Sequence, residues 1–186
     1  MFPSEVVEDK FMIYMMESEN SSLWRRGTPT RHKSPEGGND TIGFGHKLTD
    51  EEIRTNRVYA HRLDEPLSVK DCIKILRTDL VRAKITLTQR LETAAEVWLP
   101  DLPIRSQLML LDFEFNLGNC VDKFPRFTHA VCTGDIAGQR KEFKRYYRDP
   151  YDGMKPLFKR NVDFWDTFLT DEVIEWWNKV DRESES

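Results

Sequence analysis

Apolar side chains recur at helical spacing along most of this chain. Over residues 6–18 they return every three or four positions, which predicts a helix, and a polar loop follows. The clearest stripe predicts a longer helix over about residues 68–92, with Ser68 as its N-cap. At 1.5 Å per residue this helix would be roughly 36 Å long, which is enough to link two lobes. A capping box at residues 49–52 predicts a short helix from Asp50. Further helices are predicted over residues 104–116, 125–132, 135–147, 156–169 and 170–180.

A glycine-rich segment at residues 37–49 departs from this helical pattern. It combines four glycines with residues of high β propensity, such as Thr41, which predicts a hairpin. Gly43 and Gly45 alternate with bulky side chains, so one face of the strand is bare. A bare face beside the polar Thr41 suits an extended polymer that lies on it. The glycine spacing alone is equally consistent with a hairpin that binds nothing.

The chain has 186 residues, of which 32% are charged, and a net charge of −4. This length fits one domain, or two lobes that share a helix. Because phosphate binding requires an excess of Lys and Arg, the acidic balance argues against nucleic acid as the main partner. No apolar run approaches the roughly 18 residues of a membrane span and no secretory signal is visible, so we expect no stable membrane insertion. The three cysteines and four histidines lack metal-ligand spacing, which predicts no metal site, and the odd number of cysteines fits a reducing compartment.

Two residues have the chemistry that glycoside hydrolysis requires. A glycosidase uses a carboxylic acid whose pKa is raised by apolar surroundings, together with a group that holds water on the other side of the sugar. Glu19 follows the apolar stripe of the first predicted helix, four residues after Met15. Thr41 carries a hydroxyl that can hold a water. The alternative is that Glu19 is a solvated glutamate at a helix end and that Thr41 is present for its β propensity.

The hairpin sequence resembles one family. The residues that carry the resemblance are Thr41-Ile42-Gly43-Phe44-Gly45-His46, a glutamate upstream at a helix end, and Leu48-Thr49-x-x-Glu52. They are similar to the phage-type lysozymes, the Glu-Asp-Thr muramidases, strongly over residues 36–52 and more loosely over most of the remaining chain. The resemblance implies an α+β, lysozyme-like fold in a single domain, 1–186. The expected parts are an N-terminal catalytic lobe with a short β-sheet at about 1–67, a connecting helix at about 68–92 and a helical C-terminal lobe at about 93–186.

The resemblance implies that a glutamate of the first helix is the general acid and that Thr41 helps to place the attacking water. Two alignments are open: the apolar stripe favours Glu19, whereas a shift of two residues selects Glu17. The family commonly carries an aspartate six positions before the threonine. Here that place is Pro35, or Ser34 if the hairpin has one extra residue. Ser34 is therefore the nominal occupant, and the identity of the general base is open.

Other groups near the hairpin are candidates for the base. Asp40 is adjacent to Thr41, and neighbours in a strand point to opposite faces, so Asp40 would enter the site only through a bulge. Glu36 and His32 lie in the loop that leads to the hairpin, and either could supply a base from there.

The resemblance also assigns residues outside the catalytic group. His46 is expected to pair with Asp79 on the connecting helix, which would raise the pKa of His46 and join the lobes. Lys47 and Phe115 are expected to line the glycan-binding cleft, although Phe115 would equally suit the core. Eight Lys and Arg side chains lie between residues 140 and 160, where they either bind an anionic wall polymer or outer-membrane surface or form a solvated helix face.

These features predict a peptidoglycan muramidase, an endolysin, that hydrolyses the β-1,4 bond between N-acetylmuramic acid and N-acetylglucosamine. By resemblance it is a monomer that needs no cofactor and whose partner is the peptidoglycan glycan strand. It would accumulate in the infected host's cytoplasm and reach the wall through a separate pore protein, or be carried in the virion. Two alternatives are a lytic transglycosylase, in which one carboxyl acts as acid and then base, and a non-catalytic wall-binding virion protein.

Overall fold

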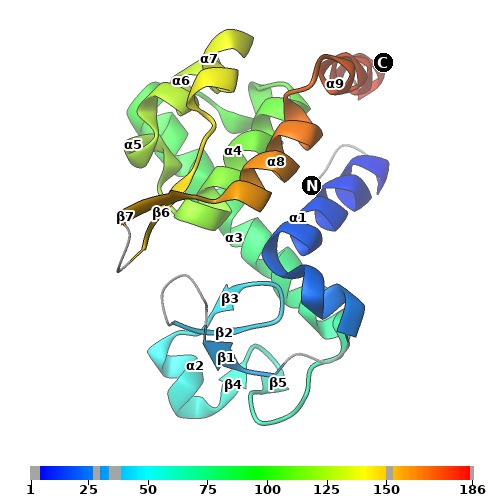
Figure 1. Cartoon of the computed structure of the whole chain (residues 1–186), viewed down its shortest axis with the longest axis vertical. Helices are drawn as coiled ribbons and strands as arrows, with labels where there is room; N and C mark the ends of the chain where they lie inside the picture. The colour runs from blue at the N-terminus through cyan, green and yellow to red at the C-terminus, as the bar shows by residue number, and fades with distance from the viewer. Residues whose placement is uncertain (1–4, 27–29, 34–38, 150–152, 185–186) are drawn as a thin grey trace. The chain divides into compact units, whose positions relative to one another are not determined.

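The structure, a computed structural model, describes residues 5–26, 30–33, 39–149 and 153–184 (Figure 1). Most of these residues are helical. The helical elements are α1 (Glu5–Arg26), α2 (Asp50–Thr55), α3 (Val69–Ala95), the 3-10 turn η1 (Leu99–Asp101), α4 (Ile104–Leu117), α5 (Cys120–Lys123), α6 (Pro125–Cys132), α7 (Ile136–Glu142), α8 (Phe158–Phe168) and α9 (Asp171–Ser184). The strands, which pair antiparallel, are β1 (His32–Lys33), β2 (Asp40–Ile42), β3 (His46–Lys47), β4 (Arg57–Val58), β5 (His61–Arg62), β6 (Tyr146–Asp149) and β7 (Gly153–Pro156).

The chain forms two compact units. One unit is Met15–Val81, and the other combines Met1–Tyr14 with Arg82–Ser186. Both divisions fall within helices, because α1 continues past the first boundary and α3 past the second. The first turns of α1 therefore group with the C-terminal helices, whereas the expected N-terminal lobe contained all of residues 1–67.

The unit Met15–Val81 contains the hairpin expected from the glycine-rich segment. Its sheet has the order β1-β2-β3, in which Thr41 pairs with His32 on one side and with Lys47 on the other. The neighbouring side chain of Ile42 is fully buried. A second hairpin, β4–β5, was not among the elements predicted from the sequence, because strands of two residues are too short to show a period.

The helix starts predicted at residues 49–52 and at Ser68 are confirmed. Thr49 Oγ1 accepts a hydrogen bond from the Glu52 N–H at 3.2 Å, and the Glu52 carboxylate accepts one from the Thr49 N–H at 2.8 Å. This is a complete capping box. Ser68 Oγ accepts a hydrogen bond from the Asp71 N–H at 3.1 Å at the start of α3. α3 has 27 residues, begins at Val69 and covers the rest of the predicted range, which was about 68–92.

The first helix is longer than predicted. α1 continues to Arg26, whereas the polar residues after Ser18 predicted a loop. Asn and Ser are only moderately poor helix formers, and such a weak local preference is overridden where the adjoining turns are held by packing. Met15 and Met16, just before this stretch, are 0% and 5% exposed. Glu19 therefore lies inside the helix and not at its end.

The other unit is built around α4. Every residue of α4 from Leu108 to Glu114 is buried, as expected of a helix covered on most sides. Phe113 stacks on Phe127 with ring centroids 4.0 Å apart, and Phe164 meets Phe113 edge to face at 5.4 Å. These aromatic contacts join α4, α6 and α8 into one core.

A buried charge cluster lies on the same helix. The two carboxylate oxygens of Asp112, which is fully buried, accept hydrogen bonds from Arg145 at 2.5 Å and Arg160 at 2.6 Å. Burial alone would raise the pKa of Asp112, but the two guanidinium groups outweigh it and lower the pKa. The Arg145 guanidinium also lies 4.6 Å from the Phe113 ring centroid. Two of the eight basic residues between 140 and 160 are therefore core residues and not surface cations.

The helix predicted over residues 135–147 is wrong beyond Glu142. α7 ends there, and β6 pairs with β7 in the register that sets Tyr146 opposite Pro156. Aromatic residues such as Tyr146 favour strands. The Leu157 N–H donates to the Arg145 carbonyl at 2.9 Å and continues the pairing beyond the strands, so the buried Arg145 anchors the hairpin.

The last two predicted helices are confirmed as α8 and α9, and α9 extends to Ser184. Trp177 is 1% exposed and stacks on Phe168 with centroids 6.1 Å apart. The Lys10 ammonium lies 3.7 Å from the centroid of the Trp176 ring, and burial lowers the pKa of Lys10. The aromatic residues of α9 thus belong to the packing of their unit.

Replacing Asp112 by Asn is expected to lower the free energy of unfolding by about 3–5 kcal/mol, because two buried guanidinium groups lose their counter-charge. Denaturant unfolding measures the change. Lys179→Gln is the control: it removes the exposed Lys179–Glu183 pair, 3.7 Å apart, which is worth at most about 1 kcal/mol. Equal effects of the two substitutions would contradict a structural role for the cluster.

Candidate active site

The Glu19 carboxyl lies against the glycine-rich hairpin. A Cβ placed on Gly45 would lie 2.9 Å from Glu19 Oε2 and 3.5 Å from its Cδ. Glu19 is half-buried and comes one helical turn after the buried Met15. The carboxyl is thus held between an apolar turn of α1 and a hairpin backbone that carries no side chain at this point.

The alternative acid, Glu17, lies on another face of α1. It is exposed and follows Ile13, which is 50% exposed, by four residues. Residues four apart share a face of a helix, so Glu17 belongs to the exposed stripe and Glu19 to the buried one.

Only one of the two alternating glycines leaves an open face. Gly43 is buried, and a Cβ on it would meet the Cys72 side chain at 3.5 Å. Gly45 is exposed. The bare surface expected from the alternation is therefore confined to Gly45, because the face at Gly43 is covered by α3.

Thr41 lies in the centre of the sheet and is 7% exposed. Its hydroxyl donates a hydrogen bond to the His32 carbonyl at 3.2 Å. The hydroxyl oxygen can still accept a hydrogen bond from water, because donating uses only its proton. Lys47, the other cross-strand partner of Thr41, has an exposed side chain. Lys47 also borders a surface hollow of about 450 Å³ whose lining includes Lys33, Asn39 and Asp40.

The candidates for the general base lie in different places. Asp40 pairs across the sheet with Lys33, and its Oδ2 accepts hydrogen bonds from Arg31 at 2.9 Å and Lys33 at 3.0 Å. The hydrogen bond from Arg31, followed by that from Lys33, lowers the pKa of Asp40 to about 2. Because Thr41 is its neighbour in the strand, Asp40 faces the opposite side of the sheet.

His32 is exposed, and its Nδ1 lies 3.0 Å from the Thr30 carbonyl. Ser34, Pro35 and Glu36 lie outside the described residues. Phe115 is half-buried on α4 and belongs to the other unit, Met1–Tyr14 with Arg82–Ser186.

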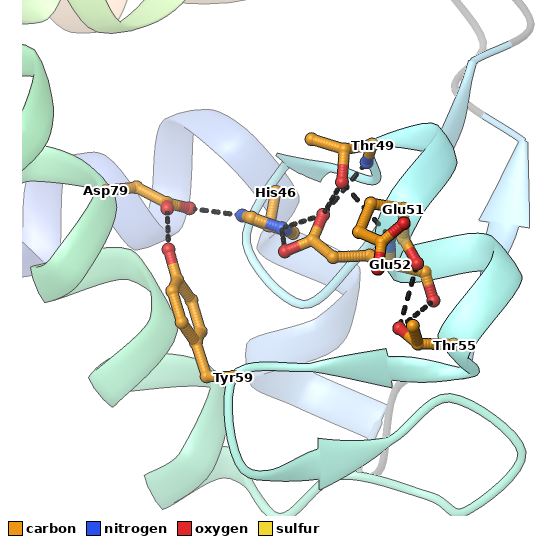
Figure 2. A network of polar contacts seen from close by, with 7 residues as sticks. All are labelled: His46, Thr49, Glu51, Glu52, Thr55, Tyr59 and Asp79. Atoms are coloured by element: carbon orange, nitrogen blue, oxygen red, sulfur yellow. Dashed lines mark hydrogen bonds and ion pairs between the residues drawn. The ribbon is translucent and has the colours of Figure 1, made fainter.

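His46, the last residue of the hexapeptide, is the centre of a polar network (Figure 2). Its Nδ1 lies 2.7 Å from Asp79 Oδ2, and its Nε2 lies 3.2 Å from Glu52 Oε1. The other oxygen of Asp79 accepts a hydrogen bond from the Tyr59 hydroxyl at 2.6 Å. Asp79 on α3 therefore holds both the end of the glycine-rich hairpin and the turn between β4 and β5.

Two carboxylates determine the charge of His46, which is 8% exposed. Burial alone would lower the pKa of His46, but the hydrogen bond and charge of Asp79, with those of Glu52, outweigh burial and raise it. Burial would likewise raise the pKa of Glu52, but the hydrogen bonds from Thr49 and the charge of His46 lower it. The network is therefore most stable with His46 protonated and Glu52 ionised.

Among the described residues, no group of three or more His, Cys, Asp or Glu side chains is arranged to hold a metal ion. Within the same residues, no helix has the length and apolar character needed to cross a membrane.

Comparison with known proteins bears on the fold. No family model matches the chain, and no curated protein matches it. Among solved structures, the chain is similar to the muramidase domain of SpmX from Asticaccaulis excentricus, with a TM-score of 0.53 and 16% sequence identity. The match covers 86% of this chain and 95% of that one. The chain has a lysozyme-like α+β fold. At this level of identity the likeness concerns the fold alone.

Two members of the network in this lysozyme-like fold were missed as site residues. Glu52 was noticed as the end of a capping box and as part of the resemblance but was given no role in the site, because nothing in a local motif shows that the same carboxylate also reaches His46. Tyr59 carried no signal at all. Its contact with Asp79 joins residues 20 positions apart, and its positive backbone φ of 49° is rare for a bulky residue.

The network predicts how stability depends on pH. The raised pKa of His46 contributes stability that is fully present below its ordinary pKa of 6.5 and is lost as the pH rises through the raised value. The lowered pKa of Glu52 contributes stability that is present above 4.5 and is lost as the pH falls. Asp79→Asn is therefore expected to cost about 1.5–3 kcal/mol near pH 6 and less near pH 9, measured by thermal unfolding.

Tyr59→Phe provides the matched control. It removes the other hydrogen bond to Asp79 without changing a group that titrates between about pH 5 and 9. Its cost should be the same at both ends of that range. A cost of Asp79→Asn that does not vary with pH would contradict the charged pairing of His46.

Proposed function

We propose that this chain is a phage-type muramidase that hydrolyses the β-1,4 bond between N-acetylmuramic acid and N-acetylglucosamine in peptidoglycan, with Glu19 as the general acid. The observation that carries the proposal is the position of the Glu19 carboxyl against the bare backbone of Gly45. The lysozyme-like fold, shared with a muramidase domain, supports it. The resemblance of the hexapeptide at residues 41–46 to the phage-type lysozymes supports the finer assignment.

The residues suit the two halves of the reaction. The Glu19 carboxyl, half-buried and one helical turn after the buried Met15, donates the proton to the leaving glycosidic oxygen. On the other side of the sugar, the Thr41 hydroxyl accepts a hydrogen bond from the attacking water. The base that takes the water's proton comes from the segment before the hairpin, where His32 and Glu36 are the candidates. Ser34 is the nominal occupant of the aspartate's place and is not itself basic enough for this step.

A lytic transglycosylase is the second candidate, and one observation favours it. The place where the family commonly has an aspartate is Ser34 or Pro35, and Asp40 is engaged by Arg31 and Lys33 on the opposite face of the sheet. A transglycosylase needs no group to place a water, since one carboxyl donates the proton and then accepts one from the sugar itself. Its product is an anhydro sugar, lighter than the hydrolysis product by one water.

In the proposed biological role, the enzyme degrades the wall of an infected bacterium. It acts as a monomer, either after release from the host cytoplasm through a separate pore protein or from the virion.

Glu19→Gln is expected to reduce lytic activity by at least about 100-fold, because the amide has no proton to donate. The assay is the loss of turbidity of outer-membrane-permeabilised cells. Glu17→Gln is the matched control, two residues away on the exposed face of the same helix, and should stay within about twofold of the parent. Loss of activity in Glu17→Gln alone would move the acid to Glu17. An inactive parent chain that still pellets with peptidoglycan would instead indicate a wall-binding protein.

Thr41→Ala is expected to lower the rate of hydrolysis at least about tenfold, because the attacking water loses its partner. Thr41→Ser keeps the hydroxyl and should retain most of the activity. Mass spectrometry of the released fragments checks the reaction type. Anhydro products, with Thr41→Ala as active as Thr41→Ser, would identify a transglycosylase.

A further inference from the structure

Gly43 and Gly45 both have a backbone that disfavours side chains. Their φ values are +61° and +86°, and an L-residue in the left-handed region is strained by about 1–2 kcal/mol. Both positions therefore carry a backbone cost, which is larger at Gly45 because its φ lies beyond the left-handed region of about +50° to +70°. Backbone strain acts at both positions, and a second feature is found at Gly45 alone.

What distinguishes Gly45 is the group that occupies the space of its missing side chain. At Gly43 a Cβ would meet Cys72 Cβ and Sγ at 3.5 and 3.6 Å, which are ordinary van der Waals distances. At Gly45 it would lie 2.9 Å from Glu19 Oε2 and 3.5 Å from Glu19 Cδ, and the first distance is shorter than such contacts allow. The carboxyl of Glu19 therefore occupies the place that a methyl group at position 45 would take.

We propose that Gly45 is a positioning residue for the Glu19 carboxyl, in that the lack of a side chain at position 45 lets the acid lie against the hairpin backbone. This inference rests on the proposed function only for its effect on catalysis. The carboxyl is the end of a flexible side chain, so a methyl group at position 45 displaces the carboxyl and leaves the hairpin where it is.

The consequence is a separation of activity from stability. A substitution at Gly45 moves the acid, whereas the same substitution at Gly43 produces the same kind of backbone strain without touching Glu19. A displacement of about 1 Å in a catalytic group can reduce the rate about 100-fold. The displacement of the acid is therefore expected to appear in kcat, whereas KM reports separately on whether the added methyl group obstructs the glycan.

The experiment compares Gly45→Ala with Gly43→Ala in the full chain. We expect both variants to fold, with the lower melting temperature for Gly45→Ala, and at least about a tenfold lower kcat for Gly45→Ala than for Gly43→Ala. Equal kcat values for the two variants would overturn the proposal.

A second measurement does not depend on activity. The carboxyl carbon of Glu19 is followed by NMR as the pH is varied. Its chemical shift and titration midpoint should change in Gly45→Ala and stay as in the parent in Gly43→Ala. If the parent proves inactive on peptidoglycan, the proposed function fails, and this titration alone decides the positioning role. An unchanged Glu19 signal in Gly45→Ala would overturn it.

If Gly45→Ala does not fold, the double variant Glu19→Ala/Gly45→Ala shows whether the Glu19 carboxyl or the strained backbone is the cause. With the carboxyl removed, the methyl group at position 45 has room, so the double variant should fold where Gly45→Ala does not. Failure of the double variant to recover would show that backbone strain, and not the carboxyl, excludes side chains at position 45, and would overturn the proposal.

Discussion

The candidate site depends on one contact, that of the Glu19 carboxyl with a hairpin backbone that has no side chain at Gly45. Burial of Met15 and Met16 sets the rotation of α1 and thereby the face on which Glu19 lies. The hairpin in turn is held at its end by His46, whose ring is hydrogen-bonded to Asp79 on α3. Apolar burial thus fixes the rotation of α1, and the ion pair of His46 with Asp79 fixes the position of the hairpin. Neither element alone would place a carboxyl at that point.

Each compact unit has a carboxylate with more than one partner at its centre, half-buried in the case of Asp79 and fully buried in the case of Asp112. In Met15–Val81, Asp79 joins two hairpins to a helix through His46 and Tyr59. In the other unit, Asp112 joins α4 to Arg145 beside β6 and to Arg160 of α8. A shared carboxylate ties distant segments together because losing any partner leaves a buried charge less well compensated. The two clusters differ in one respect, since a histidine titrates near neutral pH and an arginine does not.

Helix caps and long periodic helices, which depend on residues close together in the chain, were predicted correctly from the sequence. The capping box at Thr49 and the N-cap at Ser68 involve residues three apart, and the stripes of α3 and α4 repeat over many turns. The elements that were missed depend on distant partners: α1 runs through the polar residues after Ser18, and the β6–β7 hairpin begins beside Arg145, which pairs with a residue 33 positions away. For the site, periodicity placed Glu19 on the apolar stripe but left Glu17 open. The pairing of His46 with Asp79 came only from the resemblance, because nothing local links residues 33 positions apart.

The Asp112 cluster draws on three segments that follow one another along the chain, and this bears on how the C-terminal part folds. A chain that ends before Arg145 would bury the Asp112 carboxylate in the α4–α6 core with neither guanidinium present. Such a fragment would have to stay open or protonate the acid, so partly folded forms that lack α8 are disfavoured and the transition becomes more cooperative. Removing α8 is therefore expected to cost this unit more stability than the loss of its apolar contacts alone.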